Sequence, residues 1–178
     1  SVFVLLILWI ITLGVYPLIW YMKRSREFYN LGTKKRLSDT LPLMVLIILI
    51  IEIALIIIFP LTITEDMGVF YQYLSSLQII ILVGIAATAF LNLLFSIILA
   101  FISRGVINEA IFENKGISTK ISGFFTLIFG FLYLQYEINR IMDDKEEKPR
   151  KGPWIIFILV LILIGAAIYY GINLLGLI

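Results

Sequence analysis

Residues 46–59 constrain this chain most: the stretch LIILIIEIALIIIF holds thirteen apolar residues and a single carboxylic acid, Glu52. A run of this length and hydrophobicity is typical of a helix that crosses a lipid bilayer. The rest of the chain agrees, because 61% of its 178 residues are hydrophobic and only 15% are charged. Soluble domains contain about 45–50% apolar and about 25% charged residues. The sequence therefore predicts an all-α, polytopic helical integral membrane protein.

Five hydrophobic segments divide the chain, which we interpret as a single transmembrane helical domain covering residues 1–178. The segments are residues 2–22, 41–63, 76–102, 121–136 and 154–178. About 20 helical residues cross a hydrocarbon core of roughly 30 Å, so four segments are long enough. The fourth has 16 residues and is marginal. Its lack of charge favours a crossing, whereas the positive-inside rule favours a re-entrant path that leaves all 14 Lys and Arg residues on one side.

Basic residues after the first segment give the expected orientation. The loop 23–40 carries six Lys and Arg residues, which favours a cytoplasmic position for it in a multi-pass protein of the cell membrane. Pro17 is expected to kink the first segment, and Trp20 and Tyr21 to lie among the lipid headgroups. We also expect basic side chains beside the segments to contact anionic headgroups. The candidates for these contacts are Lys23, Arg24, Arg26, Lys148, Arg150 and Lys151.

Residues 106–115, between the third and fourth segments, have helical periodicity. Val106, Ile107, Ala110 and Ile111 share one face, and polar residues take the opposite face. This pattern predicts either an amphipathic helix lying in the membrane interface or an ordinary loop helix packed on the others.

A weak internal repeat links two aromatic stretches. Aligning Gly14 with Gly130 brings LGVYPLIWYMKR over FGFLYLQYEINR, so that Trp20 meets Tyr136. Each copy has a glycine near the middle of its segment, then aromatic residues, then a polar exit. The likeness is compatible with duplication of one unit and with the shared composition of aromatic membrane segments.

The first copy contains a more specific motif. Residues 10–32 carry Thr-Leu-Gly-x-Tyr, then Trp-Tyr and a basic stretch. This pattern resembles the signature of a widespread prokaryotic family of uncharacterised small polytopic membrane proteins, a domain-of-unknown-function family. The residues that fit are Thr12, Leu13, Gly14, Tyr16, Trp20, Tyr21, Lys23 and Asn30. Pro17 departs from the pattern, while residues 133–140 resemble the polar-ended second half of such proteins. The resemblance implies a small multi-pass membrane protein and brings no activity with it.

Absent residue types exclude several kinds of chemistry. The chain has neither Cys nor His, so disulfides, thiolate or imidazole metal ligands and nucleophile–histidine pairs are ruled out. A net charge of +2 is too small to indicate a nucleic-acid partner. We expect no cofactor, no metal site and no enzymatic activity.

Glu52 is the principal candidate for a functional residue. A charged side chain at a helix centre costs about 2.5–3.5 kcal/mol to insert, which about ten flanking aliphatic residues outweigh. Because burial in hydrocarbon penalises the charged form, we expect Glu52 to be neutral and bonded to a polar group of another helix. The candidate polar groups lie in the later segments: Asn92, Thr126, Gln135, Tyr169 and Asn173.

Two functions fit this pattern. If Glu52 makes a structural hydrogen bond between helices, the protein is a non-enzymatic scaffold or accessory subunit. Its partners would then be the lipid bilayer and other membrane subunits or a second copy of itself. If Glu52 is a proton or cation site, the protein is a small coupled transporter or a channel-like oligomer. The scaffold is the leading hypothesis from sequence, and transport is the alternative.

Overall fold

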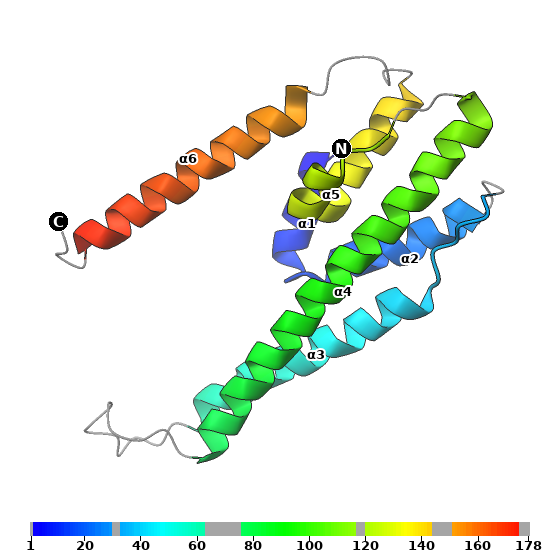
Figure 1. The fold of residues 1–178 in the computed structure, drawn as a ribbon. Helices are drawn as coiled ribbons and strands as arrows, with labels where there is room; N and C mark the ends of the chain where they lie inside the picture. Colours follow the sequence, from blue (N-terminus) through cyan, green and yellow to red (C-terminus); the bar gives the residue numbers. More distant parts are fainter. Residues whose placement is uncertain (1, 30–32, 63–75, 117–119, 144–150, 175–178) are drawn as a thin grey trace. The chain divides into compact units, whose positions relative to one another are not determined.

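The described part of the chain, residues 2–29, 33–62, 76–116, 120–143 and 151–174 of a computed structural model, consists of helices joined by turns and short connections. The predicted all-α class is confirmed. The helices are α1 (Val2–Ile11), α2 (Val15–Tyr29), α3 (Thr40–Leu61), α4 (Ser76–Lys115), α5 (Gly123–Met142) and α6 (Lys151–Leu174) (Figure 1). They fall into two compact units, Ser1–Asn139 and Arg140–Ile178, which we call unit 1 and unit 2.

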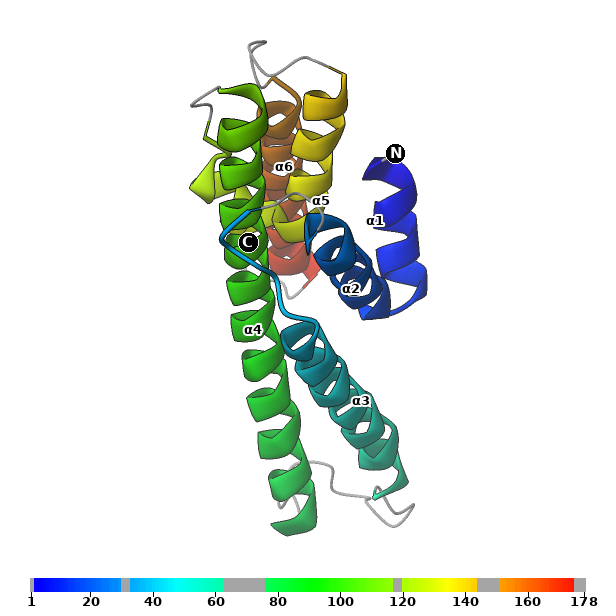
Figure 2. The ribbon, with the colours of Figure 1, turned by 90° about the vertical axis from the view of Figure 1, so that its right-hand side faces the viewer.

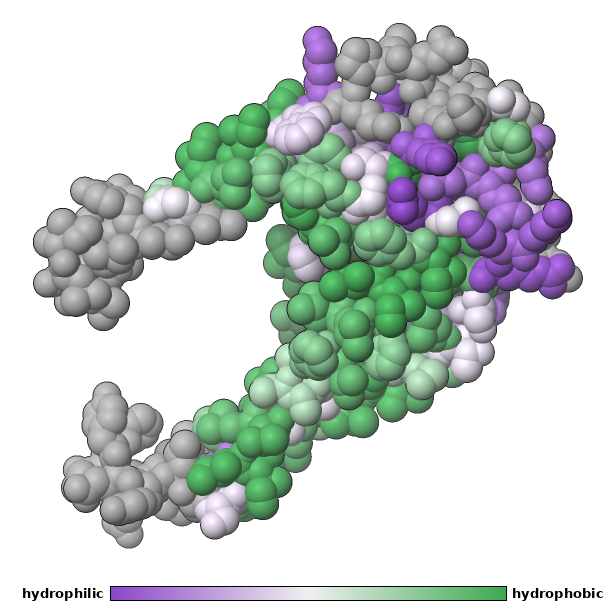
Figure 3. All heavy atoms as spheres, in the orientation of Figure 1, coloured by the Kyte–Doolittle hydropathy of each residue, from purple (hydrophilic) through white to green (hydrophobic). Residues whose placement is uncertain are grey.

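Two helices are long and apolar enough to cross a membrane, α3 and residues Ser76–Glu113 of α4. Their exposed faces are covered with hydrophobic side chains (Figure 3), among them Ile50 and Ile57, which are 56% and 62% exposed. An apolar surface of this extent is unfavourable in water. Two shorter apolar helices span Val2–Ile11 and Lys151–Ile162. The five-segment pattern stays a prediction.

α3 runs antiparallel beside the first half of α4 (Figures 1 and 2). At one end of the pair, Gln78 Nε2 donates a hydrogen bond of 3.2 Å to the carbonyl of Thr62. Nearer the middle, a Cβ atom on Gly84 would lie only 3.2 Å from Leu55 Cδ1. The glycine therefore lets the two helices approach closely, as small residues do where helices pack without water.

The first predicted segment, residues 2–22, is not a single helix: α1 and α2 meet at a sharp bend (Figure 2). Leu13 and Gly14 have positive φ angles of 49° and 91°. The Leu13 N–H bonds to the carbonyl of Ile10 at 3.2 Å, and the Gly14 N–H to that of Trp9 at 3.1 Å. These two bonds form a Schellman motif, which ends a helix by satisfying its last carbonyls.

Thr12 stabilises this bend from both sides. Its hydroxyl donates to the carbonyl of Leu8 at 2.7 Å and accepts from the N–H of Tyr16 at 2.9 Å. One side chain thus bonds the last turn of α1 and satisfies an N–H in the first turn of α2. Pro17 lies in the first turn of α2, where the missing N–H would have had no helical partner. The kink predicted at Pro17 is therefore wrong, and the chain bends before it, at Leu13 and Gly14.

A second break interrupts α5. Gly130 has φ 49° and ψ −127°, which is not a helical conformation. The fourth predicted segment, residues 121–136, is therefore two helical pieces rather than one straight crossing. This break lies at the glycine that the sequence aligns with Gly14.

α5 packs against α1 and α2 through aromatic residues. The Trp9 ring meets Phe131 edge-on at 6.2 Å between centroids, and Trp20 Nε1 donates to Gln135 Oε1 at 2.8 Å. This packing buries Trp20 and also Tyr21, which are 5% and 3% exposed. Their predicted position among lipid headgroups is therefore wrong, since such side chains would be exposed.

Residues 106–115 are not a separate helix but the last turns of the 40-residue α4. The predicted apolar face is buried inside unit 1, so the packed-helix interpretation holds and the interfacial one is wrong. On the polar side, the Glu109 carboxylate accepts hydrogen bonds from the backbone N–H groups of Lys34 and Lys35, at 2.7 and 3.3 Å. The buried face consists of Val106, Ile107, Ala110 and Ile111.

Candidate functional site

Glu52 of α3 and Asn92 of α4 are in direct contact. Asn92 Nδ2 donates a hydrogen bond of 2.7 Å to Glu52 Oε2, and both residues are partly buried. A carboxyl oxygen can accept this bond whether the group is neutral or ionised. The structure thus brings together two of the residues predicted from sequence, one from each of the two long apolar helices.

Asn92 also lines a cavity of about 390 Å³ in unit 1. The cavity wall includes both glycines at which helices break, Gly14 and Gly130, and residues from α1 to α5. Most of its lining is apolar, with Trp9 and Phe131 among the aromatic residues. Its volume and its mixture of apolar walls with a few polar groups are typical of a small-molecule site.

Two polar residues of this cavity lie on one face of α4. Asn92 and Ser96 are four residues apart and both line it, as residues on one helical face do. Thr126 of α5 also lines the cavity, but its hydroxyl donates to the carbonyl of Ser122 at 2.7 Å. Asn92, which is bonded to Glu52, therefore connects the cavity to a carboxyl side chain.

Two of the other polar candidates, Thr126 and Gln135, have hydrogen-bond partners other than Glu52. Gln135 accepts from Trp20 Nε1 at 2.8 Å and from Arg24 at 3.1 Å, which joins α5 to α2. Tyr169 and Asn173 lie in α6 of unit 2, and their side chains fall outside the described residues. Of the four candidates other than Asn92, Thr126 and Gln135 thus have different partners.

The predicted headgroup contacts differ from one another in exposure. Lys23, Arg26 and Lys151 are exposed, as the prediction requires. Arg24 is partly buried, because it pairs with Glu27 and donates to Gln135. Two further candidates, Lys148 and Arg150, lie outside the described residues.

Sequence reasoning missed Ser96 and the role of the two glycines. The alignment of Gly14 with Gly130 contained a signal for the breaks, because a glycine in mid-segment permits backbone angles that other residues avoid. Nothing in the sequence indicated that the two breaks would line one cavity. Among the described residues, no group of three or more Asp and Glu side chains is placed to hold a metal ion.

Comparisons with protein-family models, with curated proteins and with solved structures found no match to this chain. The resemblance to an uncharacterised prokaryotic membrane family therefore stays a prediction, and the function has to be argued from the site.

Proposed function

We propose that this chain is an integral membrane protein whose unit 1 binds a small, largely apolar molecule within the bilayer, and that Glu52 links this binding to the transfer of a proton. The observation that carries the proposal is the 2.7 Å hydrogen bond between Asn92, in the cavity wall, and Glu52. Ionisable residues inside membrane segments are rare and often mark proton or substrate pathways.

The membrane placement is supported by the surfaces of α3 and α4. Apolar side chains cover these helices, while hydrophilic ones gather around the end of α2 and the residues leading into α3 (Figure 3). The six Lys and Arg residues of loop 23–40 favour the cytoplasm for this polar end. With 40 residues, α4 is about 60 Å long, twice the core of a bilayer, so its last turns would project into the cytoplasm.

The two helix breaks support a binding function. Irregular backbone at membrane depth is tolerated where protein buries it or where it lines a cavity. Gly14 and Gly130 both line the same cavity. Discontinuous helices form the ligand sites of many secondary transporters. A scaffold has no need of two helix breaks facing one cavity. The breaks therefore favour transport over the scaffold, which is the leading hypothesis from sequence alone.

The hydrogen bond from Asn92 allows Glu52 to exchange a proton. In the neutral state, the Glu52 carboxyl accepts from Asn92 and retains its own proton. The proton then passes to water or to a basic group of the bound molecule, and the carboxylate that remains keeps the bond from Asn92. Because a hydrogen bond to an ionised group is stronger than one to a neutral group, Asn92 offsets part of the cost of the charge.

A scaffold or accessory subunit is the second candidate, and the same contact favours it. A hydrogen bond from α4 to α3 holds these helices together whether or not a proton ever moves. Such bonds contribute about 0.6 kcal/mol on average in membrane proteins. Other membrane subunits or a second copy of the chain would then be the partners, as well as lipid.

Proton flux into liposomes separates the two candidates. The full chain is reconstituted in liposomes that contain a pH-sensitive dye, and an inside-negative potential is imposed with potassium and valinomycin. We expect faster acidification than in protein-free liposomes, and loss of that difference in Glu52→Gln. The amide of glutamine still accepts the bond from Asn92, so the fold should be retained.

Glu109→Gln provides the matched control. It makes the same chemical change at the polar end of α4, where Glu109 accepts from the backbone of Lys34 and Lys35. We expect its proton flux to equal that of the wild type. Wild-type flux no greater than that of empty liposomes would refute proton transfer and favour the scaffold.

A further inference from the structure

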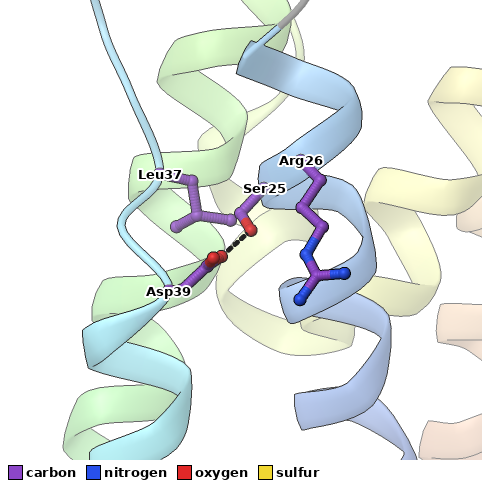
Figure 4. A pocket seen from close by; sticks show the side chains of 4 residues that line it. All are labelled: Ser25, Arg26, Leu37 and Asp39. Carbon is purple, nitrogen blue, oxygen red and sulfur yellow. Dashed lines mark hydrogen bonds between the residues drawn. The ribbon is translucent and has the colours of Figure 1, made fainter.

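A second pocket lies at the junction of α2 and α3. It has a volume of about 240 Å³ and is lined by Ser25, Arg26, Leu37 and Asp39. Ser25, Leu37 and Asp39 are turned toward one another, and the Arg26 side chain runs beside them from α2 (Figure 4). The site belongs to unit 1 and shares no residue with the cavity lined by Asn92.

The pocket has a buried floor and charged walls. Ser25 and Leu37 are buried, at 5% and 6% exposure, while Arg26 and Asp39 are exposed. The Ser25 hydroxyl donates to Oδ1 of Asp39 and fixes that carboxylate at the rim. Within the part of the chain that the structure describes, Asp39 Oδ2 and the Arg26 guanidinium have no hydrogen-bond or ion-pair partner.

Opposite charges thus line one small pocket without pairing with each other. A ligand that carries both a phosphate and a primary ammonium complements this arrangement. Arginine binds phosphate with two parallel N–H donors. A primary ammonium has three N–H donors for a carboxylate such as Asp39, whereas a quaternary ammonium has none. A purely anionic head group would be attracted to Arg26 but repelled by Asp39.

The position of the pocket along the membrane normal suits a lipid head group. Asp39 immediately precedes α3, which is long and apolar enough to cross a bilayer. Residues at the end of such a helix lie at the headgroup layer. We propose that Arg26 and Asp39 bind the phosphoethanolamine head group of a membrane lipid, with the phosphate on Arg26 and the ammonium on Asp39. The inference rests on the membrane placement proposed above but not on proton transfer by Glu52.

Short-chain lipids test this assignment. Dihexanoyl phosphatidylethanolamine, phosphatidylcholine and phosphatidylglycerol are added separately to the full chain in non-ionic detergent, and bound lipid is measured by native mass spectrometry. We expect the ethanolamine lipid to bind about tenfold more tightly than the other two, the equivalent of one charged hydrogen bond. Arg26→Gln should remove about tenfold of that affinity for the same reason. Lys34→Gln, an equal loss of charge at an exposed residue outside the pocket, should leave it unchanged.

Asp39 is tested with a control for its structural bond. Asp39→Asn should abolish the preference for ethanolamine over choline, while Ser25→Ala, which removes the bond to Asp39 but keeps the carboxylate, should retain the preference. Equal binding of the glycerol and ethanolamine lipids, or an Arg26→Gln variant with wild-type affinity, would overturn the proposal. So would equally tight binding of free phosphoethanolamine, since the ligand would then be a soluble molecule.

Discussion

Replacing Gly130 by alanine tests whether the break in α5 depends on glycine. The angles of φ 49° and ψ −127° lie outside every region that L-amino acids populate readily, including the left-handed one. Apart from the adjacent residues and the backbone of α5 itself, no atom of the described residues lies within 4 Å of the position that a Cβ would take. The penalty therefore comes from the backbone and not from a clash with neighbouring side chains.

The size of the effect follows from two opposing terms. A residue held in such a conformation costs about 1–3 kcal/mol. Alanine also lowers the conformational entropy of the unfolded chain. This effect stabilises the folded state by about 0.4–1 kcal/mol. Because ψ is far from the left-handed region, we take the upper part of the first range. Gly130→Ala should then lower the free energy of unfolding by about 1–2.5 kcal/mol.

Gly105→Ala is the matched control in the same unit. Gly105 is helical, and its Cβ would make an ordinary contact of 3.5 Å with Lys35 Cδ. Alanine at a helical position is favoured over glycine by about 0.5–1 kcal/mol. The two glycine-to-alanine changes should therefore have opposite signs.

Stability is measured by SDS titration of the protein in mild-detergent micelles, followed by tryptophan fluorescence. A Trp154→Phe background leaves Trp9 and Trp20 as the reporters, both in unit 1. Gly130→Ala with a midpoint equal to or above that of the background protein would refute the reasoning, because the backbone at this position would then accept a side chain without strain.

Two other variants test the contacts around the breaks in the same SDS titration. Thr12→Val removes the hydroxyl that bonds Leu8 and Tyr16 and should cost about 1 kcal/mol, as the loss of a helix cap does; an unchanged midpoint would mean that backbone bonds alone hold the bend. Gln135→Leu leaves Trp20 Nε1 and Arg24 without their shared acceptor and should cost about 1–3 kcal/mol. Trp20→Phe, which leaves Arg24 bonded to Gln135, should cost less than Gln135→Leu, and the reverse order would contradict this account.

The long apolar helices were predictable from sequence because their hydrophobic runs are unambiguous. The second segment was predicted as residues 41–63, and α3 spans Thr40–Leu61; the third was predicted to begin at residue 76, where α4 does begin. The contact between Glu52 and Asn92 was among the predicted possibilities, because Asn92 is one of the few polar residues in an apolar segment. Which of the candidates would meet Glu52 depends on helix register, which composition does not specify.

The helix breaks could not be located from local signals alone. Pro17 is the strongest helix-breaking residue of the first segment, but in the first turn of α2 it disrupts no hydrogen bond. The bend lies instead at Leu13 and Gly14, where the bonds of Thr12 and the Schellman motif outweigh the cost of a positive φ at leucine. In α4, the helix continues through residues 103–115 because tertiary packing buries Val106 and its neighbours, although the charged residues there resemble a loop.

The two breaks also give the weak internal repeat a physical meaning. Aligned by sequence, Gly14 and Gly130 each have a positive φ, each lie between two helical pieces and each line the same cavity. The pieces that follow them are in contact through Trp20 and Gln135. Two chance glycines would have no reason to share a positive φ, a cavity and an interface. Strained backbone persists where the surrounding structure fixes it, and often where a ligand binds. The cavity is therefore the part of unit 1 at which the repeat, the strained backbone and Asn92, the partner of Glu52, coincide. This coincidence is why we propose binding there and not on the larger apolar surface of α3 and α4.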